Sequence, residues 1–406
     1  MSVMQELQGR TLFIPEMDYG GARVLAAAFR REGIKATVVP PSNGFSNILG
    51  GKFTSGDECY PTKVTLGDFL AILERGDVKP NEAAFFMATA DGPCRFGQYH
   101  QFMKKTLEDM GHKDIPIFSL TSSNSYEGFG NEFVRIVWQG IVATDILRKF
   151  LLMTRPYEKN KGDSDVIYQD GVEDVCKLLE EKTDRQSKKL ISILKRSRDL
   201  FNKIPTVNKG SYPLIGVLGE IFCRLNAFSN QDIIRRLEEH GAECWLVGVA
   251  EWILYTNADE IRRLKEKGKR FSKAFLKTVI KRWILMKDEH DLYNHFRDDF
   301  KGREECNVND LLKMSLPYLP WYGSLGEMTL SAAGAIYFHK KGCVGVVDIS
   351  SFACMNEIVA EAIFPKISKD LNGFPIKVFY FDGTTQNLSR DIEIFLELAR
   401  NYKRKK

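Results

Sequence analysis

The sequence has no apolar run of the eighteen or so residues that a membrane-spanning helix needs. Its first residues, Met-Ser-Val-Met-Gln-Glu-Leu, also lack the basic and apolar regions of a secretion signal. A hydrophobic content of 44% over 406 residues is nevertheless ordinary for a chain with two or three packed domains. We therefore expect a cytoplasmic protein with no membrane partner.

Three short motifs are also missing. There is no C-x-x-C pair, which is common in zinc and redox sites. There is no G-x-x-x-x-G-K-[ST] loop, so the chain does not bind ATP by that route. The glycines at Gly20-Gly21 and at Gly216 and Gly219 do not complete a G-x-G-x-x-G fingerprint, and we interpret them as tight turns.

An excess of charge of one sign is lacking as well, because the formal net charge is only +5. The one concentrated basic run is Lys403-Arg404-Lys405-Lys406, which we interpret as a solvated tail. We therefore expect no nucleic-acid partner.

Cysteine, in contrast, is present at eight positions. Disulfides are rare in a reducing cytoplasm, so we do not expect these residues to pair. Five lie in apolar or helical surroundings and are interpreted as small buried apolar side chains. These five are Cys176, Cys223, Cys244, Cys306 and Cys343.

The other three cysteines share a local pattern. Cys59, Cys94 and Cys354 each lie in a turn directly before an amphipathic helical pattern, and Pro61 suits the first turn of the helix after Cys59. At a helix start, the unpaired N–H groups and the macrodipole favour a thiolate over a thiol. Because the thiolate is the form that binds metal, the pattern predicts a metal site on these three residues.

Strand and helix patterns alternate in two stretches of the chain. Strands are predicted at 11–15, 36–40, 83–90, 115–120, 214–218, 243–247, 344–349 and 376–381, and helices at 19–32, 61–73, 96–110, 231–240, 327–340 and 390–402. We interpret 42–58 as a loop. The alternation predicts an α/β fold with two Rossmann-like parallel-sheet domains joined by a helical layer.

The domain boundaries follow from the same pattern. We place the first domain at 1–130 and a helical connector, with a charged helix near 172–202, at 131–210. The second domain spans 211–406 and contains a helical insertion at about 250–315 whose Lys and Arg residues we expect on a solvated face.

Cys59 and Cys94 fall where parallel sheets hold ligands, beyond the carboxyl ends of strands. Cys354 comes from the second unit, so we expect the metal in the cleft between the two units. Three thiolates are one ligand fewer than a closed zinc or iron–sulfur site needs. A [4Fe–4S] cluster on Cys59, Cys94 and Cys354 would keep one iron open as a Lewis acid while the cluster passes one electron. A zinc site completed by His100, or three unrelated buried thiols, are the open alternatives.

Two glutamates in turns of the second stretch are candidate acid–base residues. Glu220 and Glu327 would act in the cleft between the domains, and capping or surface roles are the alternative for both.

Four segments carry a resemblance to a known family. They are Ser-Gly-Asp-Glu-Cys-Tyr-Pro-Thr around Cys59, Ala-Asp-Gly-Pro-Cys-Arg-Phe-Gly-Gln-Tyr around Cys94, Gly-Glu-Ile-Phe-Cys-Arg-Leu-Asn from Gly219, and Ser-Phe-Ala-Cys-Met around Cys354. With them the sequence, from about residue 11 to residue 400, resembles the 2-hydroxyacyl-CoA dehydratase superfamily and within it the activase-related branch.

The resemblance implies a [4Fe–4S] cluster held by Cys59, Cys94 and Cys354. It also implies a separate ATP-hydrolysing activator with its own iron–sulfur cluster, which supplies a low-potential electron. In the dehydratases of this family, the electron converts an acyl-CoA thioester into a ketyl radical, and the open iron binds the hydroxyl that leaves as water. Related proteins hold an [8Fe–9S] double-cubane cluster and reduce small molecules.

The sequence departs from the family pattern in two ways. It lacks the ATPase part, so we expect the electron donor to be a separate chain. It also has no second trio of cysteines in matching turns, which argues against a double cubane within one chain. Because no motif marks a substrate pocket, a non-catalytic cluster or electron carrier is an alternative to an (R)-2-hydroxyacyl-CoA dehydratase-like lyase or an ATP-dependent reductase. A metal-free α/β binding protein is a third possibility. The resemblance further implies a homo- or heterodimer.

Overall fold

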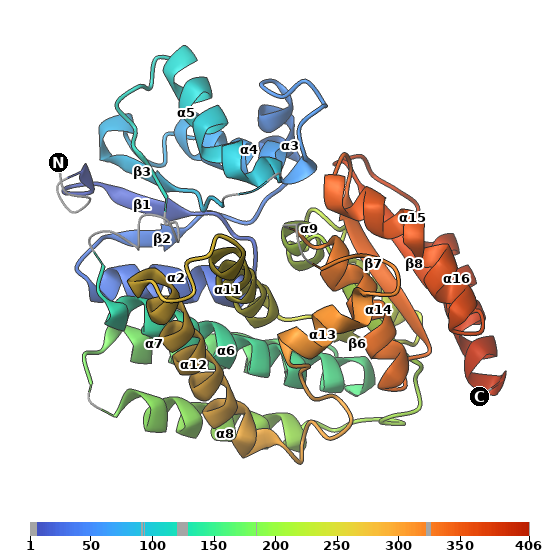
Figure 1. Ribbon diagram of the computed structural model, residues 1–406. Coiled ribbons are helices and arrows are strands. Elements are labelled where there is room, and N and C mark those ends of the chain that lie inside the picture. Colours follow the sequence, from blue (N-terminus) through green and yellow to red (C-terminus); the bar gives the residue numbers. More distant parts are fainter. Residues whose placement is uncertain are drawn as a thin grey trace.

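The structure is a computed structural model that describes residues 6–90, 92, 94–119, 129–183, 185–321 and 326–405. It contains two four-stranded sheets in which all paired strands are parallel, and helices surround both sheets (Figure 1). The predicted α/β class with two Rossmann-like parallel sheets is therefore confirmed.

The strands are β1 (Thr11–Ile14), β2 (Ala36–Val38), β3 (Ala83–Phe86), β4 (Ile117–Phe118), β5 (Leu214–Gly219), β6 (Glu243–Leu246), β7 (Gly345–Ser351) and β8 (Ile376–Phe381). The first sheet has the order β2-β1-β3-β4 and the second has the order β6-β5-β7-β8. In each sheet the earliest strand has the next two strands on either side of it. The carboxyl ends of β1 and β5 are thus switch points, where such sheets hold ligands.

The first sheet is covered by α2 (Tyr19–Arg31), α3 (Gly44–Gly51), α4 (Tyr60–Glu74) and α5 (Tyr99–Asp109). Successive side chains of a strand point to opposite faces. Phe13 and Phe85 lie in one core, where the ring of Phe69 on α4 stacks on Phe85 with 4.2 Å between ring centroids. Leu12 lies in the core on the other face with Phe29 of α2.

Helix α3 corrects the prediction that 42–58 is a loop. Asn43 caps the helix, and its side chain and that of Ser46 form reciprocal hydrogen bonds with each other's backbone N–H groups. The helix then lies against α4 at two glycines, because a Cβ on Gly50 would be 1.9 Å from the carbonyl oxygen of Lys63, and one on Gly67 would be 1.9 Å from that of Ser46. The sequence pattern does not predict this helix, because its glycines and short polar residues are also typical of loops.

Three long helices connect the sheets: α6 (Asn131–Thr154), α7 (Asp163–Glu180) and α8 (Gln186–Lys203). The predicted single helix at 172–202 is wrong, since α7 ends at Glu180. Arg31 of α2 donates to the backbone carbonyls of Leu179 and Glu181 at the end of α7. These carbonyl oxygens therefore have hydrogen-bond donors although the helix does not continue. Helix α6 contacts α2 near the first sheet, α7 and α8 in the helical layer, and β6 of the second sheet.

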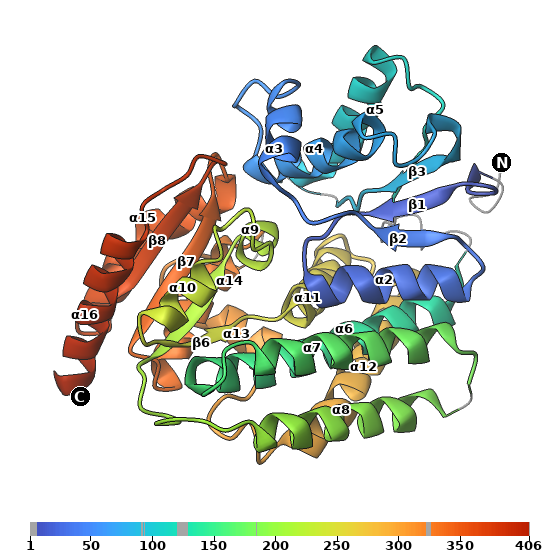
Figure 2. The same cartoon turned by 180° about the vertical axis from the view of Figure 1, so that it is seen from behind.

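The second half of the chain contains α9 (Ile221–Leu225), α10 (Ile233–Glu239), α11 (Val249–Glu266), α12 (Lys273–Tyr293), α13 (Val308–Ser315), α14 (Met328–Lys340), α15 (Met355–Asp370) and α16 (Ser389–Lys405). Helices α11 and α12 contact each other and α6. Helix α10 lies beside β6, and α16 contacts β7 and α10 (Figure 2). Helices α14 and α15 contact each other and the strands β5, β7 and β8. No helix within the described ranges is both long and apolar enough to cross a membrane.

Several predicted strand ends also change. Strand β3 ends at Phe86 rather than at residue 90, and β4 spans only Ile117–Phe118 of the predicted 115–120. Leu120 itself lies outside the described residues, as do Asp91 and Pro93 of the motif around Cys94.

Candidate functional site

The three predicted ligands all occupy helix starts. Cys59 is the N-cap residue of α4, Cys354 is that of α15, and Cys94 precedes the 3-10 turn Arg95–Gln98 that leads into α5. None of the three side chains forms a capping hydrogen bond. The predicted helix-start positions are confirmed. The backbone N–H groups of Phe96 and Glu357 lower the pKa of Cys94 and Cys354 respectively, although burial outweighs them.

Residues beside the three cysteines meet across the gap between the two sheets. The Sγ atom of Cys59 lies 3.8 Å from the carbonyl oxygen of Ala353, the residue before Cys354. Arg95, the residue after Cys94, donates from its guanidinium to the same carbonyl and to that of Asp57. Figure 1 shows the corresponding approach of α3 and α4 to the upper end of α15. The structure therefore brings the surroundings of all three thiols to one place.

Burial dominates the ionisation of the three thiols. It raises the pKa of Cys59, against the opposing effects of Arg95 and of a hydrogen bond from Tyr99. It raises the pKa of Cys94 to about 11. The pKa of Cys354 also rises, first through burial and then through the carboxylates of nearby glutamates. The expectation that these helix starts favour the thiolate is therefore wrong for the metal-free chain, and metal binding must release protons.

The two candidate acid–base residues lie at this gap and also serve as caps. Glu220 is the N-cap of α9 and accepts from the backbone N–H groups of Phe222 at 3.0 Å and Cys223 at 2.8 Å. Glu327, at the start of α14, accepts from the N–H of Ile221 at 2.9 Å. Both glutamates therefore accept hydrogen bonds from the N-terminus of α9, as the capping alternative predicts. Their carboxylates also raise the pKa of Cys94 and Cys354.

Glu327 is the carboxyl group most suited to hold a proton. It is 5% exposed, and burial together with the nearby Glu220 carboxylate raises its pKa to about 8. Burial raises the pKa of Glu220 too, against its two backbone hydrogen bonds. Since two close buried carboxylates do not both ionise readily, this pair retains a proton near neutral pH.

Three buried polar atoms without a hydrogen-bond partner lie on the segments that carry Cys223 and lead to Cys354. The hydroxyl oxygens of Ser350 and Ser351, at the carboxyl end of β7, are buried and have no hydrogen-bond partner among the described residues. The same holds for the Nε of Arg224 on α9. Buried polar atoms are normally satisfied, so this concentration beside a set of thiols fits a site that binds a further group.

Cys223 is a fourth thiol that sequence reasoning assigned to the core. It is fully buried on α9, its Sγ lies 3.9 Å from the carbonyl oxygen of Ser350, and burial, Glu220 and Cys354 raise its pKa. The signal that could have found it is the turn at Gly219 and Glu220, because Glu220 caps the helix that contains Cys223. Arg95 was also missed, although it directly follows Cys94.

The zinc alternative finds no support in this arrangement. In the described part of the chain, no three or more His, Cys, Asp and Glu side chains are close enough to hold one metal ion. The nearest partner of His100 is Gln101, at 3.0 Å between Nε2 atoms. A cluster on the three thiols stays a prediction.

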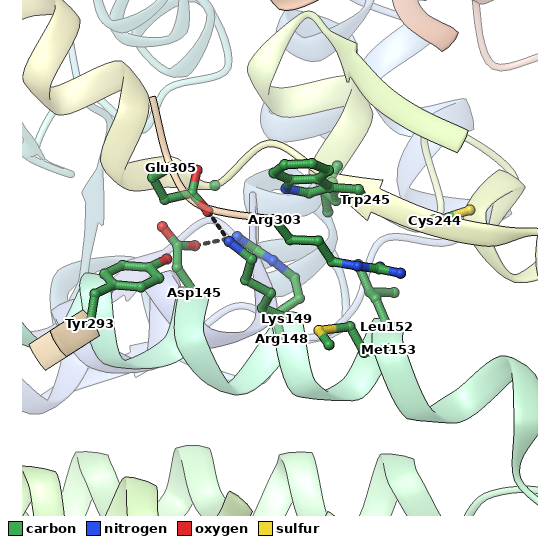
Figure 3. Close-up of a pocket in the computed structure, with 12 residues that line it drawn as sticks. Asp145, Arg148, Lys149, Leu152, Met153, Cys244, Trp245, Tyr293, Arg303 and Glu305 are labelled. Atoms are coloured by element: carbon green, nitrogen blue, oxygen red, sulfur yellow. Dashed lines mark hydrogen bonds and ion pairs between the residues drawn. The ribbon is translucent and has the colours of Figure 1, made fainter. Parts of the chain in front are cut away.

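A separate polar cavity lies at the end of β6, between α6 and the segment after α12 (Figure 3). Its charges are already paired, because Asp145 binds Arg148, Lys149 binds Glu305, and Arg303 binds Glu243. Only about 20 Å³ is accessible to the centre of a water molecule, which is room for one or two waters. We assign this cavity to structural water rather than to a substrate.

Comparisons with known proteins add no assignment. No protein-family model matches the chain, and none of the curated proteins matches it. The family resemblance therefore depends on the motif residues and their arrangement.

Proposed function

We propose that this chain is an iron–sulfur protein of the 2-hydroxyacyl-CoA dehydratase type, with a [4Fe–4S] cluster held by Cys59, Cys94 and Cys354. The observation that carries the proposal is the contact between Cys59 and the carbonyl of Ala353, which joins a helix start of the first sheet to the helix start of the second. A separate ATP-hydrolysing activator would supply the low-potential electron, and an acyl-CoA would be the substrate.

The chemistry follows from the donor set. When bound, a cluster with three thiolate ligands supplies an iron with an open coordination position and a store for one electron. Glu327, whose pKa is raised to about 8, would hold a proton at the gap and release or accept it during dehydration. Arg95 fixes the backbone around two of the ligands through its bonds to Asp57 and Ala353.

The first experiment is iron and acid-labile sulfide analysis of protein purified without oxygen, with an EPR spectrum after dithionite reduction. We expect about four irons per chain. Serine substitutions C59S, C94S and C354S should each remove most of the iron, whereas C176S, a buried cysteine on α7, should leave it unchanged. Full iron content in the first three variants would refute the ligand assignment.

The second experiment separates catalysis from electron carriage. The loaded protein is incubated anaerobically with a matched activator, ATP, a reductant and candidate 2-hydroxyacyl-CoA thioesters. A dehydratase forms the enoyl-CoA product, and E327Q should slow that step while iron content is retained. A non-catalytic cluster carrier or scaffold would take up the electron and form no product.

A double-cubane reductase is the second candidate, and one observation favours it. The Sγ atom of Cys223 lies 3.9 Å from the carbonyl oxygen of Ser350, and Cys354 raises the pKa of Cys223, so a fourth thiol is near the site. About eight irons per chain, with iron lost in C223S, would favour this [8Fe–9S] alternative.

We further propose a cytoplasmic homo- or heterodimer. The cytoplasmic location rests on the expectation that the eight cysteines stay unpaired in a reducing compartment. Light scattering should give twice the chain mass for a homodimer, and a sharp monomer peak would count against it.

A further inference from the structure

A 21-residue segment at 267–287 contains no Asp or Glu. It contains eight basic residues: Lys267, Lys269, Arg270, Lys273, Lys277, Lys281, Arg282 and Lys287. The segment forms the turn after α11 and most of α12. A net charge of +5 for the whole chain makes this concentration unusual within it.

The same segment exposes large apolar side chains. Leu276, Ile280 and Trp283 are 60%, 49% and 63% exposed, and Phe271 in the turn is 99% exposed. Residues at i, i+4 and i+7 share one face of a helix, so the three on α12 form a stripe. We call Phe271, Leu276, Ile280 and Trp283 the apolar stripe. Single exposed apolar residues are ordinary, but an aligned set is not.

The opposite face of α12 already has its partners. Leu285 and Leu292 are buried in the core, and the backbone carbonyl of Leu285 accepts from the indole N–H of Trp138 on α6 at 3.0 Å. Arg282 donates to the carbonyl of Leu254 on α11. Packing against α6 and α11 therefore does not explain the apolar stripe.

Lysines border the stripe. Lys273, Lys277 and Lys281 repeat at intervals of four residues and so form a ridge along one flank. The Nζ of Lys287 lies 5.3 Å from the centroid of a Trp283 ring. Apolar side chains flanked by cations, without an intervening acid, form a surface that complements an anionic one.

We propose that the α11–α12 hairpin docks this protein on an anionic lipid surface, with the apolar stripe at the headgroup boundary and the lysines against lipid phosphates. A basic helix that carries Trp, Phe and Leu on one face is typical of segments that lie in the membrane interface. We expected no membrane partner because the sequence has no apolar run long enough to span a membrane. Binding to the membrane surface does not need such a run.

Two other occupants fit less well. A second copy of the chain would bring eight cations against eight, and like charges across an interface are unfavourable. An acidic protein would need a groove shaped for the stripe, which lies on the side of α12 away from its contacts with α6 and α11. A deformable lipid surface covers such a stripe without a matching groove. The proposal does not depend on the proposed enzymatic function.

The test uses the full chain and two kinds of vesicle, phosphatidylcholine alone and phosphatidylcholine mixed with phosphatidylglycerol. We expect cosedimentation with the mixed vesicles only, and weaker binding as salt is raised. The double variant I280S/W283S and the double variant K273E/K277E should each lower the binding constant by about tenfold or more. L398S removes a side chain on α16 that is 55% exposed, and it should bind as the parent does.

Three results would overturn the proposal. One is no binding to anionic vesicles by the folded parent chain. Another is binding that L398S weakens as much as the two α12 variants do. The third is binding of the parent chain to polyglutamate but not to vesicles. If K273E/K277E loses that binding, the face belongs to an acidic protein partner. Circular dichroism of each variant confirms that it is folded.

Discussion

The Sγ atom of Cys59, at the start of α4, lies 3.8 Å from the carbonyl oxygen of Ala353, at the end of the second sheet. These residues are 294 positions apart in the chain. Ala353 has a φ of 64°, a left-handed conformation that is uncommon for alanine. Its carbonyl also accepts from Arg95. Ala353 is thus contacted by Cys59 and by Arg95, the residue after Cys94, and it directly precedes Cys354. A strained backbone conformation of this kind is typical of functional sites.

Arg95 should stabilise this junction measurably. Its guanidinium donates to the carbonyls of Asp57 and Ala353, and R95M removes both bonds. Because the side chain is partly exposed, we expect a loss of about 1–2 kcal/mol in the free energy of unfolding, measured by urea titration. R75M is the matched control. Arg75 is exposed, and the side-chain contact described for it is with the ring of Phe45, 5.5 Å from the ring centroid, so R75M should change the free energy of unfolding little. Equal stability of R95M and the parent would contradict the assigned role.

The glycines between α3 and α4 should not tolerate a methyl group. The new Cβ would lie 1.9 Å from the backbone carbonyl oxygen of Lys63 in G50A, and 1.9 Å from that of Ser46 in G67A. In either variant α3 and α4 must move apart. We expect each variant to lose about 2 kcal/mol or more of unfolding free energy. G44A is the control, because a Cβ there meets nothing within 4 Å. A thermal melt in which G50A matches G44A would show that α3 does not lie against α4 in this way.

Arg148 anchors α6 through buried charges. Its guanidinium binds the carboxylates of Asp18 and Asp145, both about 5% exposed, and Asp145 in turn accepts from the N–H of Ala250 at 2.9 Å. R148M leaves two buried carboxylates without their cation, so we expect a loss of about 3–5 kcal/mol in unfolding free energy.

The control for Arg148 is a surface pair. Arg196 binds Asp174 on the outside of α7 and α8, and its side chain is 60% exposed. Since exposed ion pairs contribute little, R196M should cost about 1 kcal/mol at most. If both variants unfold at the same urea concentration, the buried network is not stabilising.

The sequence predicted local features well. Strand β8 spans the predicted residues, β1 and β5 differ by one residue, and each cysteine motif does precede a helix. These features depend on apolar runs and on turn residues next to helical patterns, which are local. Helices α3 and α9 were missed because they are short, and their stability comes from capping by Asn43 and Glu220 and from contacts with distant segments.

The site could be predicted only in part for the same reason. Helix-start positions are local, but the pKa of each thiol depends on burial and on carboxylates that come from other parts of the chain. Cys223 appears in the sequence as an ordinary apolar position. Only the pairing of β5 with β7 brings it near Ser350 and Cys354.

Asp68 should make stability depend on pH. It is buried on α4, where it accepts from the Ser42 hydroxyl at 2.7 Å, and burial raises its pKa to about 7 from 3.8. A raised pKa means that the folded state holds its proton longer than the unfolded state does. Its contribution is therefore fully present below about pH 3.8 and is lost as the pH rises to about 7, by at most about 4 kcal/mol.

D68N keeps the shape and the hydrogen bond but cannot ionise. Relative to the parent, it should gain unfolding free energy progressively from about pH 4 to about pH 7 and then show a constant difference. Urea titrations of both proteins across this range provide the measurement, with D77N, at an exposed position, as the control. A difference between D68N and the parent that is the same at both ends of the range would mean that Asp68 ionises normally in the folded protein, and that its burial between Ser42 and α4 does not confer the expected pH dependence.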